Sequence, residues 1–166
     1  MRKILKIVEY NKATSGNRFI NYIIDTICLY IINIALSFLS ILLYNFTSVK
    51  FFYFYNNGGL LWEIISGNIV ASTYYYLWES LSDGRTVGKY ITNTKVISTD
   101  GLKPTNLQIL YRTLFRIIPF DALSFLGGGN GWHDSWSDTR VVNIKNYEAE
   151  RQAKSEIESI GVKEIA

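Results

Sequence analysis

Residues 17–32 read NRFINYIIDTICLYII and open the longest apolar run of the chain, residues 19–44. Ile and Leu dominate this run, and neither Pro nor Gly interrupts it. The only charged residue within it is Asp25, and Arg18 directly precedes the run. As a helix the run would be about 39 Å long, whereas the hydrocarbon core of a bilayer is about 30 Å thick. The stretch therefore predicts a transmembrane helix over 19–44.

A buried helix in a soluble domain is the alternative, but a chain of 166 residues offers too little other surface to cover a helix that is apolar on all sides. The second apolar run, residues 59–81, has Glu63 and Glu79 near its ends and no charge between them. Its Trp and Tyr residues fit an interfacial aromatic belt, and its small residues allow a neighbouring helix to approach closely. This run predicts a second transmembrane helix over 59–81. The small residues at helical spacing are Ser66, Gly67, Ala71 and Ser72.

The composition argues against several classes of function. A net charge of +3 is too small to indicate a nucleic-acid partner. With one cysteine, Cys28, and one histidine, His133, the chain can form no internal disulfide and no Cys/His zinc site, so we expect no metal and no other cofactor. Residues 1–17 carry positive charge, but their apolar stretch is too short for a secretory signal.

Basic residues are distributed unevenly around the two predicted helices. Five basic residues and one acid precede the first helix, and four basic residues follow the second within residues 82–106, whereas residues 45–58 contain only Lys50. Because cytoplasmic segments carry the excess of Lys and Arg, we expect the N-terminus and residues 82–106 in the cytoplasm and residues 45–58 outside. The run FFYFY within 45–58 is predicted as an aromatic patch in the outer interface, with a short strand as the alternative. The charged tail, residues 145–166, is predicted to be a helical or frayed cytoplasmic segment.

Residues 106–126 form a third apolar segment that carries a polar stripe. Gln108, Arg112 and Arg116 recur every four residues, and large apolar side chains take the opposite face. Two arginines at the middle of a bilayer would be unfavourable by several kcal/mol. We therefore expect an amphipathic helix in the plane of the cytoplasmic interface, with a third membrane span as the alternative.

Residues 93–98 and 139–144 are rich in β-branched side chains and predict two short strands. If these strands pair, both ends of the segment 106–126 lie on one side of the membrane, and the chain crosses an even number of times. The predicted fold is a helical membrane protein with two transmembrane helices, an interfacial helix and a small cytoplasmic pairing of strands like that of a β-hairpin. The predicted divisions are a cytoplasmic N-terminal segment (1–17), a membrane domain (18–144) and the charged tail (145–166).

Arg18 and Asp25 are seven positions apart, nearly two helical turns, so they share a helix face about 10 Å apart. Arg18 can extend its guanidinium to the cytoplasmic interface. Asp25 is shorter and lies deeper, so its carboxyl group is either protonated or paired with a cation from elsewhere, for which the arginines of 106–126 are the nearest supply. Asp134, in GGGNGWHDSW, can reach Arg18. We expect a buried charge network of Arg18, Asp25 and Asp134, with its further partners among Lys89, Arg112, Arg116 and His133.

Two motifs resemble functional ones without meeting their requirements. GRTVGKY has three residues between its glycines where a phosphate-binding loop needs four, and Tyr90 stands where Ser or Thr must follow Lys89. His133 and Asp134 are adjacent, but no motif marks a Ser or Cys nucleophile. We therefore expect no enzyme.

In the order of its motifs the sequence resembles the RDD family of small bacterial membrane proteins, which is named for one arginine and two aspartates. Arg18 and Asp25 in RFINYIID and Asp134 in WHDSWSDTRVV match these three residues. DGRTVGKY resembles the family's Gly-x-Thr-x-Gly-Lys segment, and LYRTLFRIIPF resembles its arginine-containing helix. The resemblance covers roughly residues 17–144. Many members have a longer apolar stretch after that helix than the FDALSFLGGG of this chain, which disfavours a third complete span here.

The resemblance implies a location in the bacterial cytoplasmic (inner) membrane and leaves two functions open. In the first, the charge network docks the cytoplasmic segment onto the helices, and the protein is an accessory or structural subunit bound to another membrane protein. In the second, Asp25 exchanges a proton for a cation, as the transport proposed for at least one family member implies. Two membrane helices cannot enclose a pathway, so this second function requires a homo-oligomer.

Overall fold

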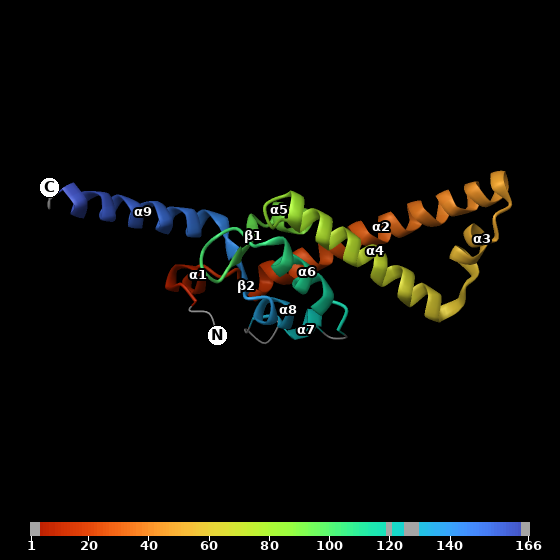
Figure 1. Cartoon of the computed structure of the whole chain (residues 1–166), viewed down its shortest axis with the longest axis horizontal. Helices are drawn as coiled ribbons and strands as arrows, with labels where there is room; N and C mark the ends of the chain where they lie inside the picture. Colours follow the sequence, from red (N-terminus) through yellow and green to blue (C-terminus); the bar gives the residue numbers. More distant parts are fainter. Residues whose placement is uncertain (1–3, 119–120, 125–129, 164–166) are drawn as a thin grey trace.

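The computed structural model of the chain describes residues 4–118, 121–124 and 130–163, which form mainly helices. Figure 1 shows an elongated molecule with a compact body at its centre. An arm of two long helices, α2 (Ser15–Thr47) and α4 (Gly59–Leu81), leaves the body on one side, and α9 (Ile144–Lys163) leaves it on the other. The helix α3 (Lys50–Asn57) joins the outer ends of the arm.

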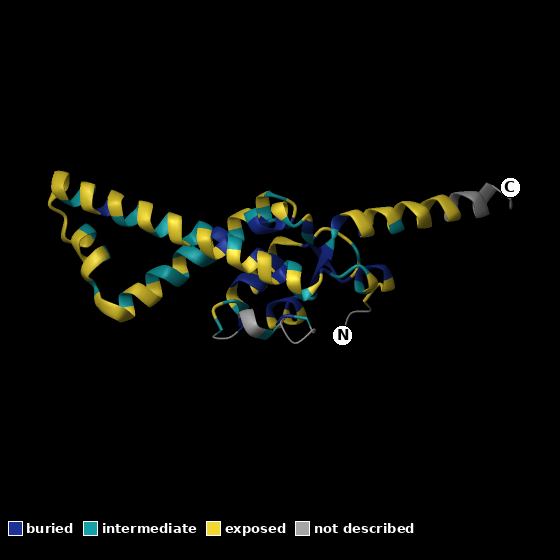
Figure 2. Cartoon of the chain, turned by 180° about the vertical axis from the view of Figure 1, so that it is seen from behind, coloured by how far each residue is buried: buried dark blue, intermediate teal, exposed yellow. Residues whose placement is uncertain are grey.

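Helix α2 contains the predicted transmembrane segment 19–44 and extends beyond it at both ends. It begins after Thr14, whose side-chain oxygen accepts a hydrogen bond from the N–H of Asn17 at 3.2 Å and so satisfies a free donor at the helix start. Among the described residues, α2 is the one helix both long and apolar enough to cross a membrane. Only 6% of its most apolar stretch of 18 residues is buried within the chain. Most residues along the arm are exposed or half-buried (Figure 2), and many of the exposed ones are large and apolar.

Helix α4 has the limits predicted from the sequence, 59–81. It is long enough to cross a membrane. Its Tyr, Trp, Asn and Ser side chains lower its mean hydropathy, however, and its composition is not apolar enough for a candidate span. Its crossing of the membrane therefore stays a prediction. Helices α2 and α4 lie against each other near the body and diverge toward α3 (Figure 1). The FFYFY run lies in α3 and is helical, so the alternative strand is wrong.

The body is built around two short strands, β1 (Thr94–Ser98) and β2 (Thr139–Asn143), which pair antiparallel with Val96 opposite Val141. Val and Thr side chains are stiff at χ1 and suit extended backbone. The predicted pairing is confirmed, although several helices separate the two strands in the chain.

The N-terminal segment, predicted as a separate stretch, pairs along the edge of β2 through a single antiparallel bridge of Lys12 with Val142. The N–H of Ala13 donates to the carbonyl of Val141 at 2.8 Å, and the N–H of Asn143 donates to the carbonyl of Asn11 at 2.9 Å. The short helix α1 (Lys6–Tyr10) comes directly before this paired segment and packs on the body. A hydrophobic cluster joins α1, both strands and the start of α9 through Ile7, Val8, Ile97, Val142 and Tyr147. The described part of residues 1–17 thus belongs to the body.

The predicted helix over 106–126 is shorter in the structure. Helix α6 runs from Asn106 to Phe115, and a capping box of Thr105 and Gln108 fixes its start. Ten residues of helix rise about 15 Å, half the thickness of a bilayer core, so α6 cannot span a membrane and the prediction of a helix over 106–126 is wrong in length. The remainder of 106–126 lies partly outside the described residues.

Helix α6 turns its polar stripe inward and its apolar face outward. Arg112 is fully buried and Gln108 nearly so, whereas Leu107, Leu110 and Leu114 are 56%, 40% and 47% exposed. This is the orientation of a helix whose outer face meets lipid, and its interfacial placement stays a prediction. The short helices α7 (Asp121–Ser124) and α8 (Trp132–Trp136) follow α6, and α8 packs beside it.

Candidate functional site

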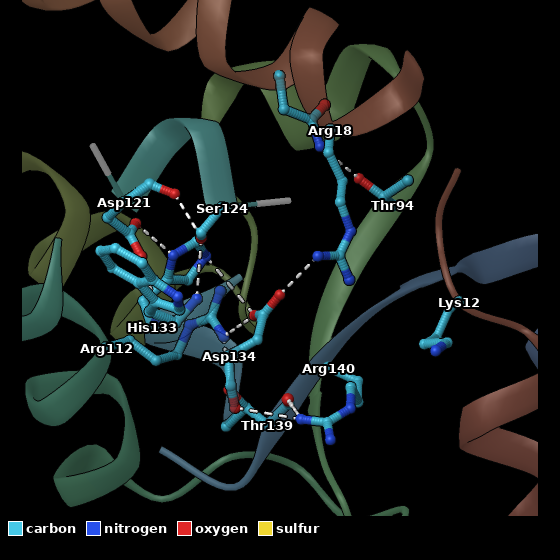
Figure 3. A network of polar contacts seen from close by, with 12 residues as sticks. Lys12, Arg18, Thr94, Arg112, Asp121, Ser124, His133, Asp134, Thr139 and Arg140 are labelled. Carbon is cyan, nitrogen blue, oxygen red and sulfur yellow. Dashed lines mark hydrogen bonds and ion pairs between the residues drawn. The ribbon is translucent and has the colours of Figure 1, made fainter. Parts of the chain in front are cut away.

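Arg18 and Asp134 form an ion pair at the junction of the arm and the body. Arg18 lies in the first turn of α2 and Asp134 lies in α8. Nη1 of Arg18 is 2.8 Å from Oδ2 of Asp134, and both side chains are almost entirely buried (Figure 3). The contact between these two residues, predicted from the sequence, thus ties α8 to the start of the predicted span.

Arg112, at the centre of the polar stripe of α6, connects two acids. Its Nη1 donates to Oδ1 of Asp134, and its Nε donates to Oε2 of Glu79 at 3.1 Å. Nη1 also donates to the hydroxyl of Thr139, the first residue of β2, at 2.5 Å. All three charged side chains are fully buried, and a buried arginine is tolerated only when acids and acceptors surround it in this way. One guanidinium therefore joins α4, α6, α8 and β2.

Glu79, in the last turn of α4, holds three cations. Its carboxylate lies 2.9 Å from Nζ of Lys89, 2.8 Å from Nη2 of Arg116 and 3.1 Å from Nε of Arg112. The guanidinium of Arg116 also lies over the ring of Tyr75, with Cζ 4.1 Å from the ring centroid. Sequence reasoning missed this role and treated Glu79 only as a charge at a helix end. The two arginines of the polar stripe could have indicated this role, because buried arginines require acidic residues on a neighbouring element.

Asp25 is buried on α2 and forms no ion pair with any described residue, so of the two alternatives expected for it, the pairing with the arginines of α6 is wrong. It accepts three hydrogen bonds instead. The hydroxyl of Tyr74 and the N–H of Gly88 donate to Oδ1, each at 2.9 Å, and the hydroxyl of Thr86 donates to Oδ2 at 2.7 Å. Hydrogen bonds to a carboxylate are strong enough to replace a cation in this role. Asp25 therefore holds the segment GRTVGK against the arm.

Gly88 allows α5 (Val87–Ile91) to lie directly on α2. A Cβ at this position would stand 2.5 Å from the backbone oxygen of Asn21 and 2.8 Å from its Cα. Gly84 in the same segment has a φ of +76°, and a Cβ there would stand 2.7 Å from the carbonyl oxygen of Val96. The motif that resembles a phosphate-binding loop is therefore a packing segment between α2 and β1.

His133 pairs with Asp121, a residue that sequence reasoning did not place in the network. Nδ1 of His133 lies 2.5 Å from Oδ2 of Asp121, and the backbone N–H of His133 donates to Oδ1 at 3.1 Å. Nε2 of His133 lies 3.6 Å from Oδ1 of Asp134. His133 therefore touches both Asp121 and Asp134 and connects α7 with α8 (Figure 3).

Comparison with known protein families gives one finding. The model of the RDD family matches residues 12–138. The chain belongs to the RDD family. Neither curated proteins nor solved structures yield a match to it. Family membership and the apolar helix α2 together indicate a membrane protein.

Burial and neighbouring charges shift the pKa of residues in the body of this RDD protein. Burial alone would raise the pKa of Asp134, but Arg112 and the other nearby cations outweigh it and hold that pKa well below its usual range. Burial lowers the pKa of His133 below its ordinary value, despite the nearby carboxylates. Burial also lowers the pKa of Lys89, although Glu79 acts in the opposite direction. Asp134 is therefore ionised and His133 neutral at pH 7.

A cavity of about 130 Å³ lies beside the buried charge network. The acidic and basic residues on its walls are Arg18, Asp25, Lys89, Arg116, Asp121, His133 and Asp134. Across the whole network, the basic side chains are Arg18, Lys89, Arg112 and Arg116, and the acidic side chains are Asp25, Glu79, Asp121 and Asp134. Basic and acidic side chains are therefore equal in number in the network. Within the described ranges, no group of three or more His, Cys, Asp or Glu residues is placed to hold a metal ion.

Proposed function

We propose that this RDD protein is a non-enzymatic accessory or structural subunit of a complex in the bacterial cytoplasmic membrane. The buried network docks the body onto the arm, and the arm binds another membrane protein. The observation that carries the proposal is the environment of the acids. Glu79 and Asp134 are paired with cations from other elements, and Asp25 accepts three hydrogen bonds. Such an arrangement fixes packing and leaves none of these three acids without a partner.

The open face of α4 supports binding to a partner. Apart from its own turns of α4, no atom of the described residues lies within 4 Å of the position that a Cβ on Gly67 would take, so α2 does not fill this face. Small residues allow helices to approach closely within a bilayer, where such contacts drive association. We assign the partner's helix to the face of α4 around Gly67.

Co-purification in a mild detergent tests this assignment. The tagged chain should recover a second membrane protein, and Gly67→Leu should reduce that recovery about tenfold while the folded yield of the chain itself stays unchanged. Ile69→Leu, on the same exposed helix, is the matched control and should recover the partner as the wild type does. The assignment fails if Gly67→Leu recovers as much partner as the wild type.

A second candidate is cation/proton exchange by a homo-oligomer. One observation favours it, because the cavity beside the network reaches Asp25, the deepest charged residue of α2. No charged residue follows Asp25 within α2, so that helix offers no further relay across a membrane. Reconstitution into proteoliposomes separates the two functions. A proton or cation flux that Asp25→Asn abolishes in a folded, assembled protein would support exchange, and full flux in Asp25→Asn would exclude it.

A further inference from the structure

A second pocket is lined in part by the first turns of α9. This helix leaves the body on the side away from the arm (Figure 1). Its volume is about 180 Å³, and it is bounded by the loop before α5, by β1, by the turn after β1 and by the first turns of α9. The phenol of Tyr147 and the turn at Gly101 form part of its wall, and the Tyr147 hydroxyl donates to the carbonyl of Gly101 at 2.9 Å. The charged residues that line it are Asp83, Arg85, Lys95, Lys103 and Arg151.

Positive charge exceeds negative charge in this pocket. Nζ of Lys103 lies 2.5 Å from Asp83, and Nζ of Lys95 lies 2.9 Å from Glu148 just outside the pocket, so both lysines are already paired with acids. Arg85 and Arg151 form no salt bridge with any residue in the described ranges. Both guanidinium groups are near enough to Glu148 to help lower its pKa, but neither is paired with it, so one from the body and one from α9 can still attract an anion.

Arg85 is held in place with a donor unused. Its guanidinium lies over the ring of Tyr90, with Cζ 5.3 Å from the ring centroid. Its Nε is buried and has no hydrogen-bond partner among the residues that the structure describes. A buried donor without an acceptor is unfavourable until a ligand or water oxygen reaches it. Guanidinium groups bind phosphate oxygens through two parallel N–H donors, so a fixed Arg with a free donor suits that chemistry.

We propose that this pocket binds a phosphate group between Arg85 of the body and Arg151 of α9. Its volume is below the range of about 300–1,000 Å³ that is usual for sites of larger ligands, and it fits a group of phosphate size. A soluble phosphate ester and a lipid headgroup share this chemistry. The position of the pocket, away from the arm, assigns the phosphate to a soluble molecule. This inference is independent of the partner assigned to the arm.

Phosphate binding would add a further contact between α9 and the body. The first turns of α9 are already joined to it by Tyr147 and by the ion pair of Lys95 with Glu148. Arg151 lies one turn further along the helix, so a phosphate shared with Arg85 would fasten the next part of the exposed tail. Trypsin cleavage after the exposed Lys154 should therefore slow when the site is filled.

The test uses the full chain in nanodiscs of neutral lipid, with inorganic phosphate and pyrophosphate as probes and ionic strength held constant with chloride. Calorimetry should show saturable binding, and Arg85→Gln and Arg151→Gln should each weaken it about tenfold, the effect of losing one charge-assisted contact. Lys154→Gln removes the same charge from α9 outside the pocket and should change the affinity less than about twofold. Unchanged thermal unfolding of each variant verifies that it folds. In the wild type, either probe should slow cleavage after Lys154.

Three results would overturn the proposal. The first is binding that does not saturate or that chloride abolishes, and the second is an equal loss of affinity in Lys154→Gln and Arg85→Gln. The third comes from nanodiscs that contain phosphatidylglycerol. If these protect α9 from trypsin while inorganic phosphate and pyrophosphate do not bind, the phosphate belongs to a lipid headgroup and the assignment to a soluble molecule is wrong.

Discussion

Nε of Arg112 donates to Oε2 of Glu79 across 3.1 Å, between two side chains with no exposure to solvent. Arg112 belongs to α6 in the body, and Glu79 lies in the last turn of α4 in the arm. Their contact fixes the body against the end of the arm. Because Glu79 also holds Lys89 of α5 and Arg116 at the end of α6, three cations share its negative charge, and its removal would leave them buried without compensation.

Glu79→Gln should therefore lower the free energy of unfolding by about 3–5 kcal/mol, the range for breaking a buried ion pair from one side. The measurement is chemical unfolding in a mild detergent, followed by tryptophan fluorescence. Glu63→Gln makes the same chemical change at the exposed opposite end of α4 and should alter stability by less than about 0.5 kcal/mol. Similar losses in the two variants would contradict a special role for Glu79.

Gly88→Ala should destabilise the protein by about 1–3 kcal/mol, because the new methyl group would meet the backbone of Asn21 and push α5 away from α2. Gly67→Ala is the matched control, since no described residue outside its own turns of α4 lies within 4 Å of the added Cβ. Alanine favours a helix by about 1 kcal/mol over glycine, so Gly67→Ala should leave stability unchanged or raise it slightly. The same unfolding measurement compares the two, and a neutral Gly88→Ala would show that α5 does not need this close contact.

His133 should make the stability depend on pH between about 7 and 5. Burial lowers its pKa below 6.5 in the folded protein, so below pH 6.5 the unfolded chain binds a proton that the folded chain does not. Stability then falls as the pH falls, by at most about 1.4 kcal/mol per pH unit, until the pH reaches the folded-state pKa. The lowered pKa of Asp134 means that its own contribution persists in this range and is lost only below about pH 4.

His133→Gln is the variant that isolates this effect, because His133 is the only histidine of the chain and Gln keeps a donor for Asp121. Thermal unfolding midpoints measured from pH 7 to pH 5 should decline in the wild type and remain nearly level in His133→Gln. Equal declines in both proteins would assign the pH dependence to another group.

The predicted topology places both termini in the cytoplasm and the tip of the arm outside. In a Cys28→Ser background, a cysteine at the exposed position of Asn57 should react with an impermeant maleimide on intact cells. A cysteine at exposed Ser155 in α9 should react only after the cells are permeabilised. Protection of the cysteine at Asn57 in intact cells would mean that α2 and α4 do not carry the tip of the arm across the membrane.

Local patterns predicted the elements of this fold but not all of its contacts. The limits of α4 and the pairing of the two strands follow from runs of residues close together in the sequence. The bond between Arg112 and Glu79 joins positions 33 residues apart, and no local pattern indicates it. The sequence of α6 indicated a polar face and an apolar face. Which of the two faces turns inward depends on whether lipid or water surrounds the helix. The position of Asp25 in an apolar helix predicted a partner for its carboxyl group. That this partner is a set of hydroxyl and backbone donors and no cation follows only from the folded structure.

The mass of the complex that the tagged protein forms in its own membranes distinguishes a subunit from a self-sufficient transporter. The complex would be extracted in a mild detergent and weighed by native mass spectrometry. We expect a species in which the 19.1 kDa chain is bound to a second membrane protein in fixed stoichiometry. A species whose mass contains only multiples of 19.1 kDa would contradict the accessory role and leave homo-oligomeric exchange as the function to test.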